Sequence, residues 1–318
     1  MNAPLVLMWI IILIMSTIGM YLGAEWFVDV LSIVRIRWGI SAAFAGTVIA
    51  VASTAPEVIM NISSAWLGLG EIGLGNVLGS NILNIPILVL IAFIASKRYW
   101  KCNLKVERET VTYHAIPYLA FVALIAALTL LPEPIYGFQW YDGLILFIGY
   151  IIYMAFVLRV GKNKGRMVKI KRSKIYKGFL GLVILAICAY FAVISSEGLA
   201  FQFNLSHLIV GLFVAALASS LPEALASWHA VKQEESVAAV TSVIDDNIIS
   251  ITLAMIPLTL VLTSIANPEL YIVSLFFVVV TAVEYTVFAY TGFHFTIGEV
   301  VVLSITYVAY VAFALQIG

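Results

Sequence analysis

Long apolar runs recur along the entire chain, and they constrain the fold more than any other feature of the sequence. Runs of this length form helices that cross the roughly 30 Å hydrocarbon core of a bilayer. Of the 318 residues, 63% are hydrophobic and only 11% are charged, whereas a soluble chain carries about 25% charged residues. The sequence therefore predicts an all-α polytopic membrane protein that sits in a lipid bilayer.

Charged residues, glycines and prolines divide the apolar runs into ten predicted spans. These spans cover residues 4–33, 39–67, 71–96, 111–131, 138–160, 175–196, 206–231, 236–264, 268–290 and 295–316. All 17 Lys and Arg residues cluster around the loops that follow odd-numbered spans, and the largest group surrounds a basic loop at 161–174. The positive-inside rule then predicts that these loops are cytoplasmic and that both termini are extracellular, in the plasma (inner) membrane. We interpret the basic loop as a topology signal; binding of anionic lipid headgroups is the alternative.

An internal repeat divides the chain into two halves. A shift of 166 residues places AVASTAPE (50–57) on ALASSLPE (216–223), and VLGSNILNI (77–85) on VIDDNIISI (243–251). We therefore expect a first five-helix repeat at 1–160 with its core near 46–85, and a second at 175–318 with its core near 211–251. Because five is an odd number, the second repeat enters the membrane from the opposite side. Such inverted repeats are typical of secondary transporters, which hold the substrate near the midplane.

Each repeat core places a proline and oxygen-bearing side chains at membrane depth. Pro56 and Pro222 each remove a backbone hydrogen bond, so we expect broken helices that free a carbonyl at each site. Four pairs of side chains, each separated by four residues, then share a helix face: Ser53 with Glu57, Ser219 with Glu223, Ser80 with Asn84, and Asp246 with Ser250. Hydroxyl, carbonyl and carboxylate oxygens are the ligands of hard cations such as Ca²⁺ and Na⁺, so the sequence predicts a cation site.

These segments also carry a family resemblance. GTVIAVASTAPEV (46–58) with GNVLGSNILN (75–84), and GLFVAALASSLPEAL (211–225) with the region of Asp245, Asp246 and Asn247, resemble the paired alpha-repeats of the calcium/cation antiporter superfamily. They are most similar to prokaryotic sodium/calcium exchangers. The resemblance implies that Glu57 and Glu223 hold Ca²⁺ and that spans 1 and 6 slide against the repeat cores. It further implies sodium ligands and one central amide, namely Ala50, Ser53, Thr54, Ser80, Ala216, Ser219, Ser220 and Asn84.

The second repeat departs from the family pattern. The family has Gly-Ser-Asn followed by a central acid or amide three positions later, whereas this chain has Asp245-Asp246-Asn247 followed by Ser250. A carboxylate has thus moved about one helical turn, roughly 5.4 Å, along the site. This change either keeps the number of carboxylates or raises the negative charge, which favours a divalent ion or makes one acid hold a proton. Asp246 is expected to line the site, and Asp245 to line it, face water or cap a break.

We therefore predict a secondary active antiporter that exchanges Ca²⁺ for Na⁺ by alternating access, functions as a monomer and needs no cofactor. H⁺/Ca²⁺ exchange, or transport of another divalent ion such as Mg²⁺ or Mn²⁺, is the alternative, and a cation channel is the rival class. An enzyme is disfavoured because none of the four histidines has the HExxH spacing, and no phosphate-binding loop indicates ATP. No sequence feature points to nucleic acid.

Overall fold

The computed structural model describes residues 2–38, 45–131, 137–160, 172–262 and 264–317. Within these residues, ten helical segments are long and apolar enough to cross a membrane, which confirms the predicted number of spans. The first five spans are α1 (Ala3–Trp38), α2 (Ala45–Ser53) with α3 (Ala55–Trp66), α4 (Gly70–Trp100), α5 (Arg108–Thr110) with η2 (Val111–Ala115) and α6 (Ile116–Leu130), and α7 (Trp140–Val160).

The second five spans follow the same order. They are α8 (Arg172–Phe203), α9 (His207–Val210) with η3 (Gly211–Ala215) and α10 (Ala216–Lys232), α11 (Ser236–Ile249) with η4 (Ser250–Ala254) and α12 (Ile256–Thr259), α13 (Pro268–Gly292), and α14 (Ile297–Ile317). Two short strands, β1 (Leu104–Lys105) and β2 (His294–Phe295), pair antiparallel. The last span therefore begins after Phe295, two residues later than predicted, because Phe295 pairs with Leu104.

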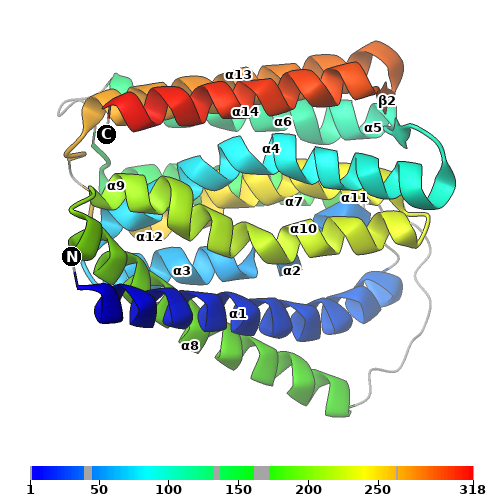
Figure 1. Ribbon diagram of the computed structural model, residues 1–318. Helices are drawn as coiled ribbons and strands as arrows, with labels where there is room; N and C mark the ends of the chain where they lie inside the picture. Colours follow the sequence, from blue (N-terminus) through cyan, green and yellow to red (C-terminus); the bar gives the residue numbers. More distant parts are fainter. Residues whose placement is uncertain (1, 39–44, 132–136, 161–171, 263, 318) are drawn as a thin grey trace.

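The helices form a layered bundle in which the two repeat cores lie side by side (Figure 1). α4 of the first repeat packs against α10 of the second, and α2 packs against α11, so each core buries the other. α1 and α8 pack mainly on each other along one side of the bundle. Spans 1 and 6 are thus neighbours outside the cores, the arrangement that a sliding pair requires.

Close approach of α4 to the second repeat depends on three glycines, Gly75, Gly79 and Gly211. A Cβ atom added at Gly75 would lie 2.4 Å from the Leu208 carbonyl oxygen, and one added at Gly211 would lie 2.4 Å from the Ile72 carbonyl oxygen. Small residues let helix backbones approach closely in membranes. Larger side chains at these positions would separate the two cores and open the site between them.

The predicted helix break occurs in the first repeat only. α2 ends at Ser53 and α3 begins at Ala55, with Pro56 in the first turn of α3. In the second repeat, Pro222 lies inside the continuous helix α10, so the expectation of a break there was wrong. A proline removes one backbone hydrogen bond without ending a helix when packing holds both sides in place, and α10 packs against α4.

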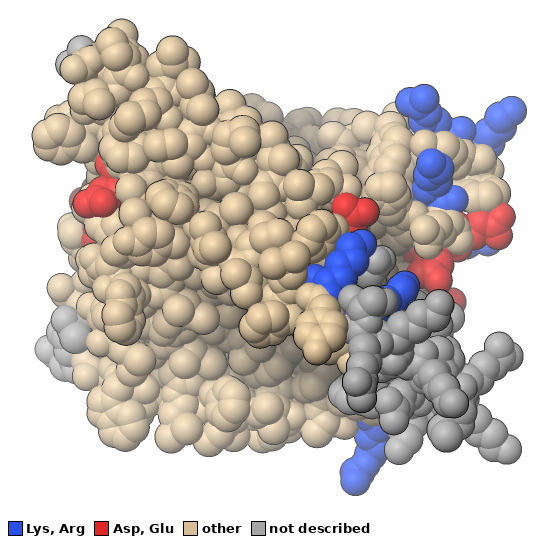
Figure 2. Space-filling view, turned by 90° about the horizontal axis from the view of Figure 1, so that it is seen from below, with Lys and Arg blue, Asp and Glu red and all other residues tan. Residues whose placement is uncertain are grey.

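Basic residues gather at one end of the bundle, opposite the end where both termini lie (Figures 1 and 2). α4 carries Lys97 and Arg98 in its last turn, and α10 ends at Lys232. Of the predicted basic loop at 161–174, residues 161–171 lie outside the described residues, and α8 begins at Arg172. The beginning of the predicted second span, residues 39–44, also lies outside them.

Candidate cation site

Glu57 is the centre of the polar cluster between the two repeat cores. It lies in the first turn of α3 and its side chain is fully buried. Its Oε1 atom accepts hydrogen bonds from the Ser80 hydroxyl of α4 and the Ser250 hydroxyl of η4, each at 2.6 Å. Its Oε2 atom has no hydrogen-bond partner among the described residues. One carboxylate thus joins both repeats and leaves one oxygen for a ligand.

Asp246 faces the helix break of the first repeat. Its Oδ1 atom accepts hydrogen bonds from the hydroxyls of Ser53 (2.8 Å) and Thr54 (2.7 Å). Sequence spacing placed Ser53 with Glu57 on one helix face, but the break at Thr54 assigns them to different helices, and Ser53 contacts the second repeat instead. Asp246 therefore reaches the same buried region as Glu57 from the opposite direction.

Glu223 has the least satisfied carboxylate of the cluster. It is 1% exposed, and in the described part of the chain neither of its carboxylate oxygens has a hydrogen-bond partner of good geometry. It lies beside the Asn84 side chain and interacts electrostatically with Asp246 and Glu57. Within the described ranges, the Oδ1 atom of Asn84 and the hydroxyl of Ser220 are also buried without a hydrogen-bond partner.

Five buried oxygens of α3, α4 and α10 have no hydrogen-bond partner among the described residues: Glu57 Oε2, both carboxylate oxygens of Glu223, Asn84 Oδ1 and Ser220 Oγ. A buried acceptor without a partner costs about 1–3 kcal/mol, and more when it is charged. Native proteins keep such groups where an ion or ligand satisfies them. No group of three or more Asp, Glu, His or Cys side chains within the described residues could hold a metal on its own. Hydroxyl and amide oxygens must therefore complete any coordination shell, as hard cations prefer.

The remaining predicted ligands lie at the edge of this cluster. The Ser219 hydroxyl donates to Asn76 Oδ1 at 2.8 Å and lies 3.2 Å from the Ala216 carbonyl oxygen. The carbonyl of Ala50, which the family resemblance assigns to sodium, accepts a hydrogen bond from the Thr54 amide at 2.9 Å. Asp245 is the exception, because its side chain makes a separate set of contacts with Thr47, His114 and Tyr153.

Sequence reasoning missed an amide network that supports the cluster. Asn247 Nδ2 donates to the Asn81 carbonyl at 3.1 Å and to the Tyr118 hydroxyl at 3.2 Å, and Tyr118 donates to Asn81 Oδ1 at 2.9 Å. Asn81 Nδ2 in turn donates to the Ser250 hydroxyl at 2.8 Å, which orients the hydroxyl toward Glu57. The identical pair Asn81 and Asn247 was visible in the repeat, but Tyr118 lies outside it and had no sequence signal.

A second missed chain of amides orients Ser219. Asn76 Nδ2 donates to Asn61 Oδ1 at 3.0 Å, and Asn61 Nδ2 donates to the Ala254 carbonyl at 3.1 Å. With its proton directed to Asn76, the Ser219 oxygen keeps its lone pairs for a cation. These amides stand four residues from Glu57 and Ser80, one helical turn along the same faces.

A cavity of about 270 Å³ runs between α1, α2 and α10 from Ser53 to the link between α10 and α11. Glu25 of α1 and His229 of α10 line it, together with Gln233 and Glu235 of the link. Because Lys232 ends α10 at this link, the cavity leads from the polar cluster toward the basic end of the bundle. The cavity therefore extends from Ser53, at the edge of the cluster, toward one end of the bundle.

The serines that donate to Glu57 give the first prediction. Removing one hydroxyl by Ser80→Ala or Ser250→Ala leaves Glu57 Oε1 with a single donor. One hydrogen bond contributes about 0.5–1.5 kcal/mol. We therefore expect the apparent affinity for the transported cation to change about three- to tenfold. Initial-rate measurements of transport against cation concentration in proteoliposomes test this. Ser304→Ala is the matched control, because its hydroxyl bonds the Val300 carbonyl within α14. Equal effects at Ser304 and Ser80 would contradict the assignment.

Ten spans in inverted repeats, with buried oxygen atoms from both cores at the interface, are typical of secondary transporters. The family model for the sodium/calcium exchanger protein matches residues 8–159 and 177–316. The chain therefore belongs to the sodium/calcium exchanger family, whose members are membrane antiporters rather than enzymes.

Individual relatives and solved structures are similar to this chain over most of its length. An uncharacterized membrane protein of Methanocaldococcus jannaschii is 26% identical over 244 residues, covering 75% of this chain and 77% of that protein. The inner membrane protein YrbG of Escherichia coli is 24% identical over 260 residues, covering 77% of each protein. A structure of the sodium-calcium exchanger NCX_Mj soaked with Na⁺ and Sr²⁺ superposes with a TM-score of 0.70 at 23% identity, covering 96% of this chain and 99% of that one. At this identity the structural match shows the fold.

Proposed function

We propose that this protein is a secondary active antiporter that exchanges Ca²⁺ for Na⁺ by alternating access, with Glu57 and Glu223 as the central Ca²⁺ ligands. The observation that carries the proposal is the set of buried oxygens without donors on Glu57, Glu223, Asn84 and Ser220. They come from α3, α4 and α10, so a bound cation would join the two repeats. A hard cation satisfies all of them at once, which no single hydrogen-bond donor could do.

Asp246 places a third carboxylate beside the two glutamates. Three carboxylates attract a divalent ion more strongly than a monovalent one, because the Coulomb energy scales with the charge of the ion. They also provide a place for a proton when the divalent ion leaves, so H⁺/Ca²⁺ exchange is the alternative. The hydroxyls of Ser53 and Thr54 that bond Asp246 are the groups that the family resemblance assigns to sodium.

The experiment that tests this function is ⁴⁵Ca²⁺ uptake into proteoliposomes that carry the purified protein, with internal Na⁺ or with a proton gradient alone. We expect uptake that requires internal Na⁺. Uptake driven by protons alone would support the H⁺/Ca²⁺ alternative, and uptake with neither counter-ion would indicate a channel. Absence of Ca²⁺ uptake under every gradient, with uptake of Mg²⁺ or Mn²⁺ instead, would assign another divalent cargo.

We further propose that the basic end of the bundle is cytoplasmic and that both termini are extracellular, in line with the positive-inside rule. The cavity beside Ser53 then opens the site to the cytoplasm, and the protein acts as a monomer whose two halves enclose one pathway. Glu25 and Glu235 would draw cations into this entrance.

Sidedness can be tested at Ala226, which lines the cavity on α10. We expect a membrane-impermeant thiol reagent to inhibit Ala226→Cys when applied from the cytoplasmic side of oriented vesicles, because a bulky adduct fills the cavity. The unsubstituted protein, which keeps Cys102 and Cys188, is the control for reaction elsewhere. Inhibition from the extracellular side alone would reverse the proposed orientation.

A further inference from the structure

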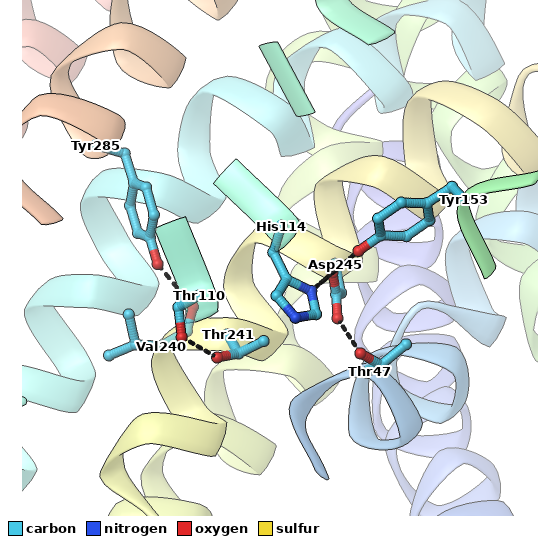
Figure 3. A network of polar contacts seen from close by, with 8 residues as sticks. All are labelled: Thr47, Thr110, His114, Tyr153, Val240, Thr241, Asp245 and Tyr285. Carbon is cyan, nitrogen blue, oxygen red and sulfur yellow. Dashed lines mark hydrogen bonds and ion pairs between the residues drawn. The ribbon is translucent and has the colours of Figure 1, made fainter. Parts of the chain in front are cut away.

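Asp245 forms a buried cluster with Thr47, His114 and Tyr153 (Figure 3). Its Oδ2 atom accepts a hydrogen bond from the Thr47 hydroxyl at 2.5 Å. Its Oδ1 atom accepts one from the Tyr153 hydroxyl at 2.5 Å and lies 2.7 Å from His114 Nδ1. The Asp245 side chain is 1% exposed, so this carboxylate is removed from water and held by donors from α2, η2 and α7.

Neither Asp245 nor Thr47 has a matching polar residue in the other repeat. The 166-residue shift matches Asp245 with Gly79 and Thr47 with Phe213. Phe213 stacks on Tyr310 with ring centroids 5.8 Å apart, so the matching region of the other half is aromatic. The Asp245 carboxylate is therefore an addition to this repeat and not one of the oxygens that the two repeats share.

The Asp245 side chain contacts Thr47, His114 and Tyr153 rather than the unpartnered oxygens, but its charge acts on the same region. It precedes Asp246 in α11, and the two carboxylates interact electrostatically. Its three donors suit an ionised carboxylate, which only accepts hydrogen bonds. His114 Nδ1 lies 2.7 Å from Asp245 Oδ1 and 3.0 Å from the Tyr153 hydroxyl, so it completes the polar surroundings of this carboxylate. Asp245 and Asp246 are consecutive residues of α11, so the Asp245 carboxylate lies within roughly 10 Å of the site.

We propose that Asp245 is a non-coordinating charge that sets the preference of the site for divalent over monovalent cations. This inference rests on the proposed function, since it concerns how the same site selects its ions. In a buried region the field of a charge reaches beyond contact distance, and its energy with a divalent ion is twice that with a monovalent ion at the same position. If Asp245 served only to fix the position of α11 through its hydrogen bonds, its removal would lower the affinity for both ions by the same factor.

The charge dependence gives a test that does not rely on overall activity. We expect Asp245→Asn to weaken binding of a monovalent ion about tenfold and binding of Ca²⁺ about a hundredfold, from Coulomb's law at an effective dielectric constant of about 20 and roughly 10 Å. Dissociation constants for Ca²⁺, and for Na⁺ as its competitor, are measured by isothermal titration calorimetry on the purified full-length protein. If Na⁺ does not compete with Ca²⁺ in the native protein, La³⁺ is titrated in place of Na⁺. The logarithm of the loss in affinity should then be in the ratio three to two for La³⁺ and Ca²⁺. Asp245→Gly, which introduces the residue found at Gly79, is the second charge-free variant and is judged by the same ratio.

Two matched variants separate charge from geometry. Tyr153→Phe removes a donor and keeps the carboxylate, so we expect a small and equal effect on both ions. His114→Gln keeps a side-chain N–H donor, so we expect unchanged affinities. A rise in Ca²⁺ affinity in His114→Gln would show that a protonated imidazole neutralises Asp245, and would overturn the proposal.

Equal losses for both ions in Asp245→Asn and Asp245→Gly would also overturn it, because they would indicate a purely structural role. Failure of the native protein to bind Ca²⁺ would instead contradict the proposed function. The two failures are therefore distinguishable in the same set of titrations.

Discussion

Glu57→Gln and Glu223→Gln should each abolish Ca²⁺ exchange while the protein remains folded. Glutamine keeps the size of the side chain but removes the charge that a cation site needs. Removing one partner of a buried charge interaction costs about 2–5 kcal/mol, so we expect the apparent Ca²⁺ affinity to fall by about a hundredfold or more. Initial rates of ⁴⁵Ca²⁺ uptake at increasing Ca²⁺ concentration measure this loss.

Thermal stability separates a lost ligand from a damaged fold. Because neither Glu223 oxygen has a hydrogen bond of good geometry among the described residues, glutamine removes a poorly compensated buried charge, and we expect the melting temperature without Ca²⁺ to stay the same or rise. Stabilisation by added Ca²⁺ should disappear, since a ligand stabilises only the state that binds it. Glu284→Gln is the matched control, because Glu284 accepts a hydrogen bond from Thr306 on the neighbouring span, and it should transport normally. Normal transport by both site variants would disprove the assignment.

Asp246→Asn should cause the second largest effect. Asparagine Oδ1 still accepts the hydrogen bonds that Ser53 and Thr54 donate, so the geometry is kept and only the charge is lost. We expect a loss in Ca²⁺ affinity of about a hundredfold, comparable to the loss of a glutamate ligand. Flux measurements as for the glutamate variants test this, and an unchanged affinity would show that Asp246 takes no part in binding.

A double variant tests whether the carboxylate has moved within the site. Asp246→Ser combined with Ser250→Asp returns the acid to the position that the family resemblance assigns to it. We expect the double variant to recover Ca²⁺ transport that Asp246→Ser alone loses, because Ser250 already contacts Glu57. No recovery would mean that the acid functions only next to the helix break, where Ser53 and Thr54 bond it.

The membrane fold followed from simple features of the sequence. Apolar runs of sufficient length fixed ten helices, and the repeat between 50–57 and 216–223 predicted two cores that meet face to face. Helix ends were less predictable, because pairing of Phe295 with Leu104 delays the last span. The break at Thr54 and the continuous helix around Pro222 differ although both segments contain Ser, Pro and Glu at matching positions. Packing decides that difference, and packing is not visible in a repeat.

The site was predictable as a set of residues but not as a set of contacts. Glu57, Glu223, Asn84 and Ser80 could be selected because polar groups at membrane depth are expensive. Their partners could not, because spacing of four residues assumes one continuous helix, and the bend at Thr54 directs Ser53 to Asp246 instead. Two adjacent acids in the sequence also proved different, since Asp246 faces the cluster while Asp245 contacts Thr47 and Tyr153.

The most direct test of the account is a structure of the protein with Ca²⁺, located by anomalous diffraction at long wavelength. We predict one strong peak between the repeat cores, at about 2.3–2.6 Å from oxygens of Glu57 and Glu223. A peak coordinated instead by Asp245, or no peak at Ca²⁺ concentrations that support transport, would contradict the claim that the unpartnered oxygens form the transport site.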